Sequence, residues 1–213
     1  MKKIYRSGLF FVFLIILTLS GCISPKIRFG ERVFEEKEIS IPYAFNLSGD
    51  KKFTLLEIDV REVDHVVSKE EKWSWDEGSI PIYRIYCPRE GFTFYIARIK
   101  VENTGGKILS FCTDLPSSFE LTTNNNTYDA MDFYLLTEEK GYTCVESNDT
   151  DYEEEVCEYF SEDIYPGEIK EGRVFFEIRE NEKPVELSFV VESTEYHVKI
   201  QSVNISSSGS ESF

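Results

Sequence analysis

FTFYIARIKVENTGG, residues 92–106, is the stretch that decides the fold class. Its apolar side chains recur at every second position, so that Tyr95, Ala97, Ile99 and Val101 share one face. The charged side chains between them point the other way. This period of two predicts a β-strand with one buried face, and the Asn-Thr-Gly-Gly sequence that ends the stretch predicts a turn.

The same alternation recurs through much of the chain, in short segments separated by turn residues. In the first of them, Leu56, Ile58 and Val60 are expected on the inner face. The one helical candidate, residues 129–136, is brief. Several short alternating strands predict an all-β fold, an antiparallel β-sandwich of about seven strands. The segments that show the alternation are 51–60, 107–111, 117–124, 172–180, 186–192 and 195–201.

The N-terminus has the layout of a secretory signal peptide, with a basic head, the apolar run Leu9–Leu19 and small residues before Cys22. As a helix this run would span about 16 Å, which is short of a bilayer core of about 30 Å. Leu19-Ser20-Gly21-Cys22 resembles the lipobox of prokaryotic lipoproteins. That resemblance implies cleavage before Cys22 and a diacylglyceryl group on its sulfur. The alternative is an uncleaved membrane anchor.

These signals divide the chain into four parts. We expect residues 1–21 to be a signal peptide and residues 22–50 a lipid-anchored tether. Residues 51–201 would form the sandwich, with an acidic insert at 137–163, and residues 202–213 a flexible Ser-rich tail. The protein would then sit on the extracytoplasmic face of the cell membrane.

Acidic residues outnumber basic ones, 39 to 23, and the formal net charge is −16. Removal of the signal peptide would also remove Lys2, Lys3 and Arg6. Such a chain is repelled by phosphate backbones and by anionic lipid. We therefore expect no nucleic-acid partner, and attachment to the membrane through the lipid on Cys22 rather than through a basic face.

Four cysteines follow Cys22, namely Cys87, Cys112, Cys144 and Cys157. None belongs to a C-x-x-C pair, which argues against a zinc site. In an exported protein an even number of cysteines predicts disulfides. Three pairings are open; we favour Cys144–Cys157, which would close the acidic insert, together with Cys87–Cys112.

Four sequons agree with an external location and mark candidate glycosylation sites. They lie at Asn46, Asn125, Asn148 and Asn204.

The insert at 137–163 holds 11 acidic residues and one lysine. Asp149, Asp151 and Glu153 alternate as oxygen ligands of Ca²⁺ often do, although Glu154 stands where an EF-hand loop requires glycine. The readings are a solvated loop closed by a disulfide, a Ca²⁺ site and a protein-contact loop.

Two groups of aromatic residues are candidate ligand contacts. Tyr142 and Tyr152 lie in the insert, where they would either contact a partner or pin the loop to the sandwich. Trp73 and Trp75, in EKWSWDEG, would share one face of an extended segment. Such a pair makes a stacking platform for sugars or peptides, or it fills an edge of the core.

Catalytic motifs are missing from the sequence. His65 and His197 are the two histidines, and neither has the spacing of a metal ligand. There is no G-x-S-x-G elbow and no phosphate-binding glycine loop. We expect a non-enzymatic protein without a cofactor or catalytic residues. The alternatives are an envelope hydrolase, in which a pocket gathers one histidine with a carboxylate and a serine, and a Ca²⁺-stabilised surface protein.

Three motifs carry a resemblance to a known family. They are the V-x-N-x-G turn at 101–105, the P-G-E turn at 166–168 and the F-x-I strand at 176–178. With the strands around them, over residues 53–201, they resemble the immunoglobulin-like domain of unknown function of prokaryotic surface lipoproteins. That domain belongs to the immunoprotective extracellular immunoglobulin-like superfamily. The chain departs from the pattern around KWSWDEG and at 137–163.

The resemblance implies an immunoglobulin-like sandwich and transfers no catalytic residue. Together with the lipobox it predicts a membrane-anchored extracytoplasmic lipoprotein that presents a binding domain, with a surface protein or a glycan as its partner.

Overall fold

The structure is a computed structural model that describes residues 35–75, 78–111, 113–138, 142–147 and 150–200. The predicted signal peptide, Cys22 and the Ser-rich tail lie outside the described residues. In the part that is described, no helix has the length and apolar character needed to cross a bilayer.

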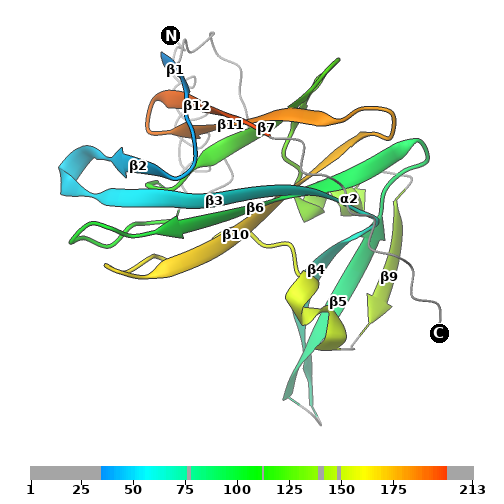
Figure 1. Cartoon of the computed structure of the whole chain (residues 1–213). Helices are drawn as coiled ribbons and strands as arrows, with labels where there is room; N and C mark the ends of the chain where they lie inside the picture. Colours follow the sequence, from blue (N-terminus) through cyan, green and yellow to red (C-terminus); the bar gives the residue numbers. More distant parts are fainter. Residues whose placement is uncertain (1–34, 76–77, 112, 139–141, 148–149, 201–213) are drawn as a thin grey trace, which may run out of the picture. The chain divides into compact units, whose positions relative to one another are not determined.

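Two sheets face each other across the core (Figure 1). β1 pairs with β12 in parallel, and the remaining neighbours in both sheets pair antiparallel. The first sheet has the strand order β1 (Glu35–Glu38), β12 (Thr194–Lys199), β11 (Pro184–Val191), β7 (Ser117–Thr123), β8 (Thr127–Asp129). The second has the order β10 (Ile169–Arg179), β6 (Phe92–Glu102), β3 (Lys52–Val63), β2 (Tyr43–Asn46).

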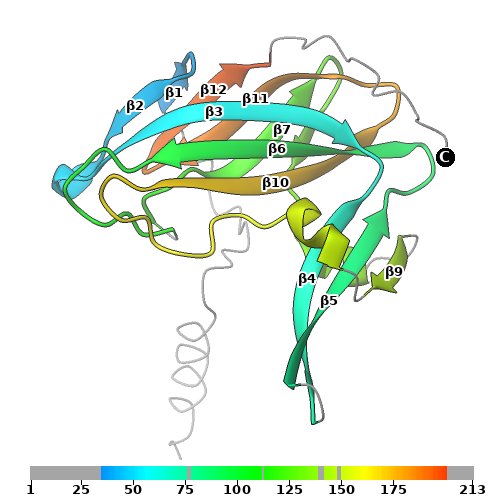
Figure 2. The same cartoon turned by 60° about the horizontal axis from the view of Figure 1, so that its bottom comes forward.

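A third sheet has the order β4 (Val66–Ser74), β5 (Gly78–Cys87), β9 (Thr143–Ser147). The helical elements among the described residues are short: the 3-10 helices η2 (Ser48–Asp50) and η3 (Thr150–Glu155), and the α-helix α2 (Phe133–Glu138). Figure 2 shows the β4–β5 hairpin extending away from the two sheets of the sandwich.

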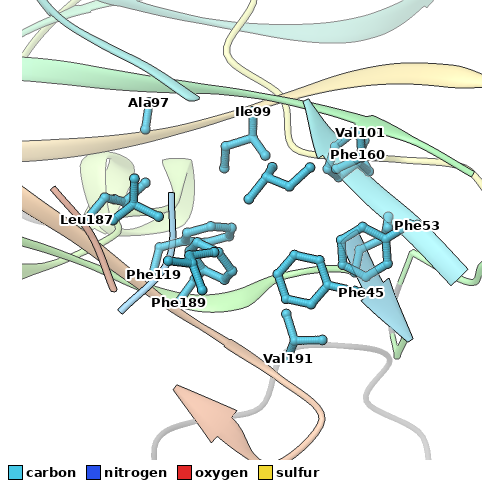
Figure 3. Close-up of a cluster of buried hydrophobic side chains, with 14 of the residues drawn as sticks. Phe45, Phe53, Ala97, Ile99, Val101, Phe119, Phe160, Leu187, Phe189 and Val191 are labelled. Atoms are coloured by element: carbon cyan, nitrogen blue, oxygen red, sulfur yellow. The ribbon is translucent and has the colours of Figure 1, made fainter. Parts of the chain in front are cut away.

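The sandwich core is formed by the alternating faces that the sequence predicts. In Figure 3, aromatic rings from both sheets meet at its centre. Phe45 stacks on Phe53 with ring centroids 4.4 Å apart, and Phe119 packs against Phe189 at 5.9 Å. Because apolar burial stabilises by about 25 cal/mol per Å², these rings are a large part of the folding free energy.

The register of β3 departs from the prediction. Phe53 and Leu55 are fully buried, whereas Leu56 is only half-buried. A β-bulge between Leu55 and Glu57 inserts one extra residue opposite β6. An extra residue shifts the alternation by one position, so the inner face continues at Ile58 and Val60, which pack on the core.

The all-β sandwich is confirmed, but four details of the prediction are wrong. The two facing sheets hold nine strands in the described chain rather than seven, because short edge strands carry too little pattern to predict. Residues 35–50, predicted as tether, include β1, β2 and η2. The helix begins later, at Phe133. Residues 107–111 form no strand, although Leu109 makes a single bridge to Ile164.

Asn103 joins the two turn motifs through its backbone. Its N–H donates to the carbonyl of Glu168 at 2.9 Å, and its own carbonyl accepts from the N–H of Gly167 at 2.8 Å. The V-x-N-x-G turn at the end of β6 is thereby fixed to the P-G-E turn that leads into β10.

The side chain of Asn103 is fully buried and satisfies three further backbone groups. Its Nδ2 donates to the carbonyls of Lys107 and Ile164, both at 2.8 Å, and its Oδ1 accepts from the N–H of Gly105 at 3.0 Å. Gly105 lies so close to Lys52 that a Cβ would meet the Lys52 backbone nitrogen at 2.8 Å. Hydrogen bonding therefore requires the Asn of this motif, and the close approach of the Lys52 backbone requires the Gly.

We expect Asn103→Ala to destabilise the protein by about 2–4 kcal/mol, because it removes three hydrogen bonds made by a fully buried side chain. Urea unfolding measures the loss. The exposed neighbour Thr104 is the matched control, and Thr104→Ala should change stability by less than about 0.5 kcal/mol. Equal, small effects of the two substitutions would contradict the role given to Asn103.

Candidate binding site on an inserted sheet

The β4–β5 hairpin is an insertion between two strands that pair with each other. β3 ends at Val63 opposite Phe94 of β6, and the chain between them runs out along β4 and returns along β5. The hairpin carries the KWSWDEG stretch, the first place where the sequence departs from the family pattern.

The acidic insert, the second departure, packs on this same hairpin. Its strand β9 pairs with β5 over residues 143–147, and η3 lies against β4 and β5. Lys69 of β4 forms an ion pair with Glu153 of η3 at 2.8 Å. The rings of Tyr83 and Tyr152 lie with centroids 6.5 Å apart. Two segments distant in sequence therefore build one unit, which we call the inserted sheet: β4, β5, β9 and η3.

A second hydrophobic cluster holds the inserted sheet to the sandwich. Tyr86 of β5 packs against Phe133 of α2, with ring centroids 5.6 Å apart, and Phe133 packs against Phe175 of β10 at 4.9 Å. The buried members of the cluster are Val66, Tyr86, Phe94, Ile96, Leu136, Cys157 and Phe175.

A buried carboxylate reinforces this junction. Glu177 of β10, only 2% exposed in its side chain, accepts from the backbone N–H and the Nε of Arg89 at 3.0 and 2.9 Å. It also accepts from the hydroxyl of Tyr142 at 2.8 Å, and the Tyr142 ring stacks on Phe94. A buried carboxylate needs such partners because an unpaired buried charge is costly.

The two tyrosines predicted as ligand contacts have structural positions. Tyr142 is held between Phe94 and the Arg89 guanidinium, and Tyr152 is half-buried against Tyr83. Of the two readings offered by the sequence, the structure supports rings that pin the insert.

Trp73 and Trp75 have the opposite character, because both are exposed. The exposed fractions are 62% for Trp73 and 91% for Trp75, so neither fills a core edge. Their ring centroids lie 4.5 Å apart at an interplanar angle of 85°, an edge-to-face pair. They occupy the far end of the hairpin, where β4 ends at Ser74 and Gly78 begins β5 with φ of 78°.

Polar groups that no sequence motif indicates lie beside the Trp pair. Ser79 is directly opposite Trp73 in the ladder, and its hydroxyl donates to Glu71 Oε2 at 2.7 Å. Glu71 is two residues before Trp73 on the same strand, hence on the same face.

A cleft of about 310 Å³ lies between the insert and β10. Its walls carry several glutamates, but two cations lie among them. Arg173 donates to the carbonyls of Glu154 and Val156, and Lys170 pairs with Glu162 at 2.7 Å. A smaller cleft, of about 220 Å³, lies between β2 and the β11–β12 turn.

The Ca²⁺ site predicted from Asp149, Asp151 and Glu153 stays a prediction, because Asp149 lies outside the described residues. The part of the chain that is described contains no group of three acidic, His or Cys side chains placed to hold a metal. Side chains at alternate positions share a face only in an extended segment, whereas residues 150–155 form η3. At three residues per turn, side chains two apart point to different sides, and Glu153 instead pairs with Lys69.

The favoured disulfide between Cys144 and Cys157 is also not formed, since both are free thiols. Cys157 follows Val156, which bridges Val67 of β4; Cys144 lies on β9, beyond β5. Three strand spacings of about 4.8 Å separate them by roughly 14 Å, far more than a disulfide spans. Cys87 is likewise a free thiol, and Cys112 lies outside the described residues.

The two histidines contact carboxylates. His197 Nδ1 lies 2.9 Å from Glu186. His65, in the β3–β4 turn, lies between Asp64 at 2.6 Å and Glu155 of η3 at 2.7 Å. Neither ring lines either cleft or hydrogen-bonds a serine in the described structure, so the gathering that the hydrolase alternative requires is not seen there.

His65 holds η3 to the sandwich as a cation. Partial burial disfavours its charge, but the hydrogen bonds to Glu155 and Asp64 outweigh that cost and raise its pKa above the ordinary value. Both ring nitrogens face acceptors, so both must carry a hydrogen.

Two of the candidate glycosylation sites are accessible. Asn46 ends β2 and Asn125 lies between β7 and β8, and both are exposed. Asn148 and Asn204 lie outside the described residues.

Residues 47–200 match the family described as Domain of unknown function (DUF4352). The match covers well over half of the 213 residues. The chain belongs to this family. The DUF4352 match runs from before β3 to the end of β12, so both inserted segments lie inside it. The predicted resemblance to a domain of unknown function is thus confirmed, whereas the superfamily and the lipoprotein signal stay predictions.

Two solved structures are similar to this DUF4352 chain. One is an uncharacterized β-sandwich protein from Clostridium difficile 630, 18% identical, with 81% of this chain and 99% of that chain covered and a TM-score of 0.40. The other is a conserved hypothetical protein from Bacillus anthracis, also 18% identical, with 75% and 94% covered and a TM-score of 0.40. No curated protein matches the chain.

We expect the stabilisation from His65 to be fully present below its unfolded pKa of about 6.5 and to be lost as pH rises through the raised folded pKa. Melting temperatures between pH 5.5 and 9 test this. Glu155→Gln should remove much of the difference between the two ends of the range, and Glu154→Gln, its neighbour, should not. A wild-type profile that matches Glu155→Gln throughout would contradict the contact.

We expect the two described cysteines of the insert to differ in reactivity towards a maleimide. Cys144 is exposed and should be labelled in the native protein, whereas burial raises the pKa of the Cys157 thiol to about 12 and should protect it until unfolding. Peptide mass spectrometry reports each site. Protection of both cysteines after unfolding, until a reductant is added, would show that each is in a disulfide and would contradict the free thiols.

Proposed function

We propose that the protein is a lipid-anchored, extracytoplasmic binding module without enzymatic activity. Cys22 carries the lipid, an immunoglobulin-like sandwich is the scaffold, and the Trp73–Trp75 pair contacts a surface partner. The observation that carries this proposal is the exposure of both indoles on a hairpin that the rest of the insert supports.

The support of the hairpin favours a functional reading of its tip. An isolated two-stranded hairpin is marginally stable in water, but β9 adds a third strand here and η3 covers β4 and β5. Tryptophan is a costly residue to leave in solvent, and exposed apolar groups on a stable element mark interaction sites. Two segments, β9 and η3, therefore support the hairpin that holds the aromatic pair in water.

The location of the protein rests on sequence. A basic head, a short apolar run and the Leu-Ser-Gly-Cys tetrapeptide support lipidation at Cys22. The acidic net charge of −16 supports attachment through lipid, since anionic membranes repel such a chain. An anchored domain meets other envelope components in two dimensions, which raises the frequency of encounters for a binding site of modest affinity.

Intact-mass measurement of the protein from native membranes tests the anchor. We expect a mass that lacks residues 1–21 and carries added lipid, and a loss of that lipid in Cys22→Ser. On intact cells, a membrane-impermeant maleimide should label Cys144. A full-length unmodified mass, or labelling of Cys144 only after lysis, would contradict the proposal.

A further inference from the structure

We propose that the Trp73–Trp75 pair, with Glu71 and Ser79, binds a neutral pyranose sugar whose ring substituents are equatorial. This assignment rests on the proposed function, because it names the ligand class of the same site. Pyranoses of this kind, such as β-1,4-linked glucose or N-acetylglucosamine, present an apolar C–H surface on each ring face and polar groups around the rim.

The arrangement of the site matches those two surfaces. The indoles offer apolar faces in water, 62% and 91% exposed. Their interplanar angle of 85° makes a corner, so one sugar ring that stacks on an indole has the edge of the second beside it. Trp73 is the inner member, and the polar groups lie next to it.

Glu71 and Ser79 supply hydrogen bonds at the rim. Ser79 lies opposite Trp73 in the ladder, where Cβ atoms are about 5 Å apart. Glu71, two residues before Trp73, lies on the same face of β4. Their mutual hydrogen bond of 2.7 Å leaves the serine oxygen and the carboxylate with free acceptor capacity. Both are exposed, so sugar hydroxyls can reach them.

The size of the patch disfavours a protein partner. A stable protein interface buries about 800 Å² on each side around an apolar centre. Apart from the Trp pair, the large apolar side chains that are exposed in the described chain lie on other elements: Ile108, Tyr134, Val145, Tyr165, Ile169 and Val185. Two indoles by themselves suit a small ligand.

Charge disfavours a membrane and selects among sugars. Interfacial membrane elements surround their aromatic residues with Lys and Arg. On β4, Glu71 shares the face of Trp73, whereas Lys72 alternates to the other face and Glu70 pairs with Arg84 at 2.6 Å. Anionic lipid and acidic glycans are repelled by the Glu71 carboxylate, so the ligand class is an uncharged sugar.

Tryptophan fluorescence reports this site alone, because Trp73 and Trp75 are the two tryptophans of the chain. We would titrate the full chain, in a detergent without a sugar headgroup, with cellotetraose and with chitotetraose. We expect a saturable change of emission with a millimolar Kd, as for about 4 kcal/mol of binding. A uronic-acid tetrasaccharide should give no saturable change.

The variants assign the contacts, with calorimetry as a second readout. Trp73→Ala or Trp75→Ala should weaken binding roughly 10-fold, and Glu71→Ala or Ser79→Ala roughly 3-fold or more. All four side chains are exposed, so urea midpoints should stay at the wild-type value. Tyr134→Ala, which removes an aromatic ring 67% exposed on α2, is the matched control and should bind as wild type.

Three results would overturn the assignment: no saturable change with either neutral tetrasaccharide, binding that survives Trp73→Ala and Trp75→Ala, or a response to phosphatidylglycerol vesicles in place of the sugars. Failure of the titration while Cys22 carries lipid refutes the sugar ligand and leaves the anchored module standing. Sugar binding by a chain that lacks lipid on Cys22 would refute the anchor and leave the ligand standing.

Discussion

The fully buried side chain of Asn103 is the constraint on which the sandwich depends. One amide satisfies two carbonyls and one N–H, and the backbone of the same residue pairs with the P-G-E turn. Buried polar groups are costly unless they are bonded, so this residue fixes where β6 ends and where β10 begins. Those two strands flank the core, and they also carry Phe94 and Phe175, on which the inserted sheet rests.

The inserted sheet turns a structural scaffold into a candidate binding protein. The sandwich itself places its aromatic rings inside, whereas the β4–β5 hairpin places two outside. β9 pairs with β5, η3 lies against β4 and β5, and the Glu177–Arg89 pair reinforces the junction with the sandwich. Stability at the base and exposure at the tip are therefore separate features, which allows the tip residues to be exchanged without unfolding the domain.

The alternation of apolar residues along the sequence predicts the features that depend on neighbouring residues alone. Burial on one face dictates a period of two, so the long strands and most inward residues were predictable. The bulge after Leu55 was not, because it depends on the partner strand. The association of β9 with β5 joins segments about 60 residues apart and leaves no sequence signal, so Cys144 and Cys157 were paired by proximity in sequence. The sequence does not decide whether Trp73 is exposed, because two aromatic residues at alternate positions occur both at hairpin tips and at core edges.

Acrylamide quenching of tryptophan emission tests most directly whether the inserted sheet holds its aromatic pair in solvent. The tryptophan emission comes from Trp73 and Trp75 together, since these are the two tryptophans of the chain. We expect the native protein to be quenched nearly as efficiently as the same chain unfolded in urea. Strong protection in the native state, released on unfolding, would show that the indoles are buried and would contradict a binding site at the hairpin tip.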